Sequence, residues 1–208
     1  MPRAAGVRIP LFPLHTVLFP GGVLPLKVFE QRYVEMTKAC LRDDAPFGVC
    51  LIREGSEVAH GGDDAGPVFF PIGTMAHVTA WDVPQVGILH LATRGGARFR
   101  VERRERTASG LAVGEVVPLP AEPKVPLTPA QAPLARLLEA VAARAGPGRF
   151  PPEGDFGDAS FVGYRLAELL PLPLAIKQTM LEVSDAGVRL GVLQRFLLEK
   201  GVLAGPAT

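Results

Sequence analysis

The chain has 208 residues, 48% of them hydrophobic, with 22 basic and 21 acidic side chains that leave a formal net charge of +1. The apolar content excludes a disordered chain, and the near-neutral charge gives no overall attraction to nucleic acid or to an anionic membrane. Two cysteines are too few for a disulfide-rich secreted scaffold, and prolines interrupt the longest uncharged runs, 9–26 and 65–81. With no signal-peptide pattern at its start, the sequence indicates a soluble, cytoplasmic protein.

Short apolar runs joined by Gly- and Pro-rich turns occupy the first half of the chain and predict β-strands. The runs are 7–12, 23–29, 46–52, 68–81, 87–93, 97–105 and 111–119. The segment Arg94-Gly95-Gly96 predicts a turn between the fifth and sixth runs. In the sixth run, alternation predicts that Phe99 faces inward with its alternate neighbours, and that Arg98 faces outward. Seven such strands indicate a small barrel or sandwich.

One helix is predicted within this series, over 30–42, where apolar residues such as Tyr33 and Met36 recur at helical spacing. The strand before it, 23–29, is apolar on both faces and contains Pro25. Because proline cannot donate a ladder hydrogen bond, this strand is expected at an edge of the sheet or at a bulge.

The apolar spacing becomes helical after the proline-rich segment 118–123. It predicts about four amphipathic helices, in which Asp158 or Ser160 caps the second and Arg189 of the fourth points outward. We therefore expect a β-rich unit over residues 1–122 and a helical subdomain over 123–208.

The usual signatures of catalysis are missing. The sequence contains no Gly-x-x-x-x-Gly-Lys-Ser/Thr loop for nucleotide phosphates and no Gly-x-Ser-x-Gly nucleophile. Its four histidines and two cysteines lack the close spacing of zinc ligands. We therefore assign no catalytic residue, metal ligand or cofactor, and expect neither ATPase nor peptidase activity.

Arginine is concentrated in the run 94–106. The candidate ligands for an anion are Arg94, Arg98, Arg100 and Arg103. Such a strand could bind RNA, another phosphate or an acidic peptide, or it could be a solvated outer face that is neutralised across strands. Beside the predicted helix start, Arg32 has Glu30 as an ion-pair partner within reach.

Two segments near the start, 9–14 and 17–33, resemble the Lon protease N-terminal domain family. Further similar segments follow in the family's order: 47–52, 72–76, 98–101, 161–170, 178–182 and 189–193. The resemblance implies an α+β fold, a PUA-like pseudo-barrel of short strands with one inserted helix, followed by a C-terminal helical subdomain. It also implies contact with substrate polypeptides. The ATPase and serine–lysine protease modules of Lon have no counterpart in this sequence, so it looks like a stand-alone form of the domain.

The candidate polypeptide-binding residues lie in and around the 23–29 strand. They are Phe19, Pro20, Gly21, Gly22, Leu24, Leu26, Phe29 and Tyr33. A free strand edge beside exposed apolar side chains could bind unfolded segments, although Phe19 could instead fill the barrel. The expected partners are unfolded or exposed polypeptide segments or a specific protein, with a protease or chaperone machine as one candidate.

Two other functions stay open at this point. RNA binding through the arginine run follows only from analogy with PUA-like folds, which is a weak basis, and the near-neutral charge makes nucleic acid an unlikely partner. An enzyme without a recognisable motif is the other, which a buried carboxylate or histidine at the base of a deep pocket would favour.

Overall fold

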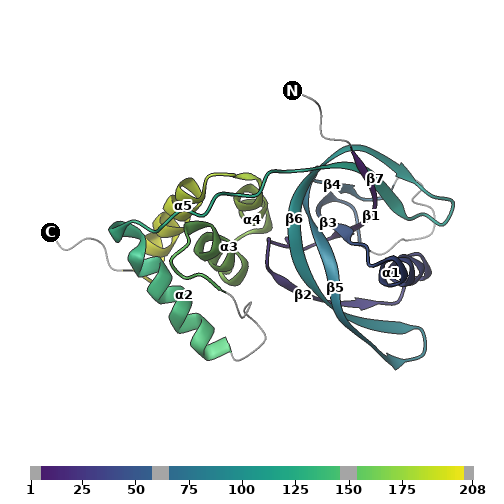
Figure 1. The fold of residues 1–208 in the computed structure, drawn as a ribbon, viewed down its shortest axis with the longest axis horizontal. Coiled ribbons are helices and arrows are strands. Elements are labelled where there is room, and N and C mark those ends of the chain that lie inside the picture. Colours follow the sequence, from purple (N-terminus) through teal and green to yellow (C-terminus); the bar gives the residue numbers. More distant parts are fainter. Residues whose placement is uncertain (1–5, 58–65, 146–153, 204–208) are drawn as a thin grey trace. The chain divides into compact units, whose positions relative to one another are not determined.

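The computed structural model describes residues 6–57, 66–145 and 154–203, and the chain divides into two units, Met1–Ala121 and Glu122–Thr208. Strands with one helix make up the first unit, and helices make up the second (Figure 1). The first unit contains β1 (Val7–Leu14), β2 (Val23–Val28), α1 (Gln31–Asp43), β3 (Phe47–Glu54), β4 (Val68–Phe69), β5 (Ile72–Gln85), β6 (Ile88–Arg106) and β7 (Ala112–Pro118). The predicted α+β fold class is confirmed.

The strands form a sheet that returns on itself. Its order is β1-β7-β6-β5-β3-β4, and β1 also pairs in parallel with β3, which closes a ring of β1, β7, β6, β5 and β3. Because β4 pairs only with β3 and β2 only with β6 among the described strands, these two lie outside the ring. The result is a pseudo-barrel of short, mainly antiparallel strands and not a clean barrel.

The predicted turn at Arg94-Gly95-Gly96 is wrong, because β6 runs through it without a break for 19 residues. Gly95 allows the backbone of β6 to approach the backbone of Phe19, because a Cβ at this position would lie 2.2 Å from the carbonyl oxygen of Phe19. The Gly95 amide also donates to the Gly22 carbonyl at 2.8 Å. A glycine inside a strand therefore marks backbone contact here and not a change of direction. The β5–β6 turn comes earlier, where Gly87 adopts a φ of 83°.

Helix α1 is placed close to its predicted bounds and connects β2 to the barrel core. Tyr33, Val34 and Met36 are among the buried residues of this helix. The Tyr33 ring stacks on Phe12 of β1 with 3.9 Å between ring centroids. Stacking of this kind adds to the apolar burial and fixes the side of the helix that faces the barrel.

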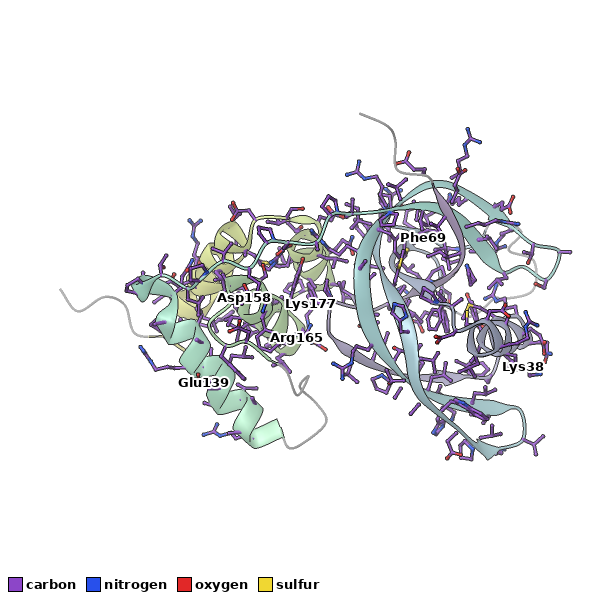
Figure 2. All side chains as sticks on the ribbon, viewed as in Figure 1. Lys38, Phe69, Glu139, Asp158, Arg165 and Lys177 are labelled. Carbon is purple, nitrogen blue, oxygen red and sulfur yellow. The ribbon has the colours of Figure 1, made fainter. Side chains whose placement is uncertain are left out.

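The second unit consists of η1 (Pro129–Gln131), α2 (Ala132–Ala145), α3 (Ala159–Leu169), α4 (Leu174–Glu182) and α5 (Ala186–Glu199). Its core is leucine-rich and includes Leu134, Leu138, Leu166, Leu190, Leu193 and Leu197. Asp158, at the start of α3 (Figure 2), caps that helix by accepting from the amides of Ser160 and Phe161. In the described part of the chain, no helix has the length and apolar character needed to cross a membrane.

Arg189 is fully buried, so the prediction that it points outward from α5 is wrong. Its guanidinium donates to the Glu122 carboxylate at 3.0 and 2.5 Å and lies 3.8 Å from the centroid of the Tyr164 ring. Glu122 also accepts from the hydroxyls of Tyr164 and Ser160. This ion pair attaches the first residue of the helical unit to α3 and α5.

Replacement of Arg189 should therefore destabilise the helical unit. Arg189→Ala leaves the Glu122 carboxylate buried without its charged partner, which typically costs about 3–5 kcal/mol. We expect a loss of that size in the free energy of unfolding measured by urea denaturation. Arg195→Ala, at an exposed position of the same helix, is the matched control and should change it by about 0.5 kcal/mol or less. Equal effects of the two variants would contradict a stabilising role for the pair.

The same pair should make stability depend on pH. Burial opposes ionisation of Glu122, but the hydrogen bonds from Arg189 and Tyr164 outweigh it and hold the pKa of the carboxyl below its usual 4.5. A lowered folded-state pKa stabilises the fold above the unfolded-state pKa, and this contribution is lost as the pH falls through the folded-state pKa. The stability difference between the wild type and Glu122→Gln should therefore be largest near pH 7 and shrink toward pH 3. A difference independent of pH would show that Glu122 does not titrate in this way.

Candidate functional site

Strand β2 is an edge strand, as Pro25 predicted. It pairs antiparallel with β6, from Val23 opposite Arg94 to Val28 opposite Leu89, and with no other described strand. The Gly95 amide donates to the Gly22 carbonyl, so Gly22 is a hydrogen-bonded position of this ladder. Hydrogen-bonded and non-hydrogen-bonded positions alternate along an antiparallel strand. The backbone N–H and C=O groups of Val23, Pro25 and Lys27 therefore point away from β6. The lack of an N–H at Pro25 therefore costs no hydrogen bond to β6. At the open edge, the backbone amides of residues 23 and 27 remain available as donors.

The candidate polypeptide-binding residues divide by exposure. Phe19, Gly22 and Tyr33 are buried, whereas Pro20, Gly21, Leu24 and Leu26 are intermediate. Leu24 and Leu26 pack against the barrel core. Phe19 is a core residue, in agreement with the alternative that it fills the barrel. Phe29 is 54% exposed and is the one large side chain of the set that offers its apolar surface to solvent.

Exposed apolar side chains missed by the sequence reasoning lie on the β5–β6 hairpin, which projects from the strand-rich unit (Figure 1). Trp81 is 58% exposed and Val86 96% exposed, and Val83 is also exposed. Val28 pairs with Leu89, close to the hairpin turn, so Phe29 follows alongside the hairpin tip. We call Phe29, Trp81, Val83 and Val86 the apolar hairpin patch. Leu26 and Trp81 lie opposite the same residue, Leu91, on the two sides of β6, so one strand separates Trp81 from β2.

Two cavities meet at Tyr33. One, of about 160 Å³, lies between β2 and the start of α1 and is lined by Pro25, Leu26, Phe29 and Tyr33 among others. The second, of about 260 Å³, is lined by Tyr33, Phe69 and three arginines. Burial raises the pKa of the Tyr33 phenol, so the wall that the two cavities share is uncharged at neutral pH.

The predicted arginine ligands do not form one site. Arg98 is 4% exposed, so the prediction that it offers its charge to solvent is wrong, whereas Arg100 is exposed. Arg94 and Arg103 are nine residues apart on one strand, a separation of about 30 Å. Arg103 lies 4.0 Å from Glu115 of β7. The outer face is therefore partly neutralised across strands and does not present a continuous cationic stripe.

The reactive side chains that the structure describes form no metal or thiol centre. In residues 6–57, 66–145 and 154–203, no three or more His, Cys, Asp or Glu side chains group to hold a metal ion. Cys40 and Cys50 are buried and unpaired as thiols. Desolvation raises the pKa of both, which disfavours the nucleophilic thiolate.

The structure combines a pseudo-barrel that has one inserted helix and an open strand edge with a helical unit. Residues 8–199 match the family model of the ATP-dependent protease La (LON) substrate-binding domain. The chain belongs to this family, and the resemblance to the Lon N-terminal domain is confirmed.

Similar proteins agree with that assignment. Lon protease 2 of Myxococcus xanthus is 36% identical over 94 residues, and Lon protease of Anaeromyxobacter dehalogenans (strain 2CP-C) is 35% identical over 94 residues. Each alignment covers 45% of this chain and 11% of the relative, so the chain matches a small part of those proteins.

Solved structures cover nearly the whole chain. The Lon N-terminal domain protein from Xanthomonas campestris has a TM-score of 0.75 and 36% identity, and the alignment covers 91% of this chain and 98% of that one. The N-terminal domain of Mycobacterium avium complex Lon protease has a TM-score of 0.62 and 17% identity, with 90% and 96% covered. The second likeness supports the fold alone.

Phe19→Ala should act on stability. Removal of a fully buried Phe side chain leaves a cavity and typically costs about 3–5 kcal/mol. We expect a loss of that size in the free energy of unfolding, whereas Phe29→Ala, at a half-exposed position, should cost much less. Urea denaturation of both variants checks this. If the Phe19→Ala protein had unchanged stability but bound polypeptide poorly, Phe19 would instead be part of the binding surface.

Proposed function

We propose that the chain is a non-catalytic module that binds exposed polypeptide segments on the apolar hairpin patch and along the free edge of β2. Membership of a substrate-binding domain family supports the general role. The observation that carries the location is the exposure of Phe29, Trp81, Val83 and Val86, in the same unit as β2, which pairs with one neighbour only among the described strands. A location in the cytoplasm, and delivery of the bound chain to a protease or chaperone machine, belong to the same proposal.

The two halves of this surface contribute in different ways. Large aromatic side chains such as Trp81 and Phe29 provide apolar area that is not specific for sequence, as a module for unfolded chains requires. The β2 edge offers carbonyl acceptors at Val23, Pro25 and Lys27 and amide donors at two of them. Because Pro25 removes the central donor, backbone pairing alone would be weak, and apolar contact must supply most of the affinity.

Truncation of the aromatic anchors should weaken binding without unfolding the protein. Loss of an anchor at an interface typically costs about 2 kcal/mol or more, which corresponds to a factor of about thirty in Kd. We expect Trp81→Ala to weaken the binding of a labelled, permanently unfolded polypeptide at least tenfold, and Phe29→Ala to act in the same direction. Fluorescence anisotropy measures the Kd, and thermal melts show whether each variant is folded.

The matched control is Val7→Ala. Val7 is 47% exposed but lies at the start of β1, opposite Val116 of β7 and outside the patch. This variant should bind as the wild type does. Unchanged binding by folded Trp81→Ala and Phe29→Ala proteins would place the polypeptide site elsewhere.

A further inference from the structure

A cavity of about 260 Å³ is lined by three arginines and shares Tyr33 with the cavity beside β2. We call it the arginine cavity. Its lining includes Arg32, Tyr33, Phe69, Arg104, Glu105 and Arg106. Tyr33 also lines the cavity beside β2 and Phe29. The two cavities therefore have one lining residue, Tyr33, in common.

Arg32 forms a fixed wall of this cavity. Its side chain is 9% exposed, and its guanidinium pairs with Glu30 at 2.9 Å and donates to the Gly110 carbonyl at 3.2 Å. The guanidinium also lies 4.6 Å from the centroid of the Tyr33 ring. Its Nε, which is buried, has no hydrogen-bond partner. These contacts hold Arg32 in place, and the described protein groups around it leave the Nε–H of its guanidinium without an acceptor.

Among the described residues that line the cavity, Arg104 is the charge that has no ion-pair partner. It is exposed, and its guanidinium lies 5.4 Å from the centroid of the Phe69 ring on β4 (Phe69 is labelled in Figure 2). No carboxylate of the described residues forms an ion pair with it. Glu105, the acidic residue of the lining, is paired with Arg8. The neighbouring Arg103 differs, because it lies near Glu115 and does not line this cavity.

We propose that the arginine cavity binds a carboxylate of the polypeptide that lies on the β2 edge, with Arg104 as its ligand. The substrates are then apolar segments that are flanked by an acidic side chain or that end in a free C-terminal carboxylate. Guanidinium groups match the planar carboxylate through two parallel hydrogen bonds. The rings of Tyr33 and Phe69 contact the apolar stem of the same residue and reduce the solvent screening of the pair.

This inference rests on the proposed function, and three labelled peptides with one common apolar segment test it. The first carries a flanking Asp and an amidated C-terminus, the second carries Asn and a free C-terminal carboxylate, and the third carries Asn and an amidated C-terminus. The wild type should bind the first or the second about tenfold more tightly than the third, because hydrogen bonds to charged groups are strong. The peptide that gains affinity identifies the source of the carboxylate.

Arg104→Gln should remove this gain while changing the affinity for the third peptide less than about twofold. Arg103→Gln is the matched control, since it removes the same charge one residue away, and it should leave the ranking of the peptides unchanged. The gain should also fall as salt concentration rises from 50 mM to 500 mM, because the pair is partly exposed.

The outcomes separate the two proposals. Equal binding of all three peptides, or an equal loss with Arg103→Gln and Arg104→Gln, overturns the carboxylate site and leaves polypeptide binding in place. Failure of the folded wild type to bind any of the three overturns the proposed function and this inference with it. Weaker binding of all three peptides by Trp81→Ala, with the ranking among the peptides unchanged, supports both proposals.

Discussion

The close approach of β6 to the Phe19-Pro20-Gly21-Gly22 segment is the constraint on which the binding surface depends. A Cβ at Gly95 would lie 2.2 Å from the Phe19 carbonyl oxygen, so only glycine lets β6 pass this point as a continuous strand. On one side of Gly95, β6 holds β2 and forms the projecting hairpin with β5. On the other side it pairs with β7 and carries Arg104 to its cavity. The free edge of β2, the apolar hairpin patch and the arginine cavity therefore all depend on the course of β6.

Features set by local chemistry could be predicted from the sequence. Helical spacing placed α1, and the absence of an amide hydrogen at Pro25 placed β2 at an edge. The turn at Gly95 was predicted wrongly because a Gly pair favours a turn and a close backbone contact equally, and the contact partner, Phe19, is remote in sequence. Arg189 shows the same limit: its burial depends on Glu122, which lies 67 residues away and supplies the opposite charge.

The candidate site was only partly predictable for a related reason. Proline and glycine around Phe19 suggested an exposed turn, yet the side chain is fully buried within the barrel. Trp81 lies in a strand whose pattern is typical of burial, and its exposure arises because the β5–β6 hairpin extends beyond the core. Whether an apolar residue is covered depends on how far each element reaches past its neighbours, and spacing along the sequence does not contain that information.

In the proposed mode of binding, apolar and charged groups have separate roles in a nearly neutral module. A net charge of +1 gives no long-range attraction, so any charge recognition must come from one local group. Apolar contact with Trp81 and Phe29 is available to almost every unfolded segment and provides affinity with little selectivity. A single partly shielded arginine adds a preference, because chains without a carboxylate leave its charge unpaired while chains with one match it. The proposal thus places affinity and selectivity on separate residues, with the buried Tyr33 lining the cavity on each side.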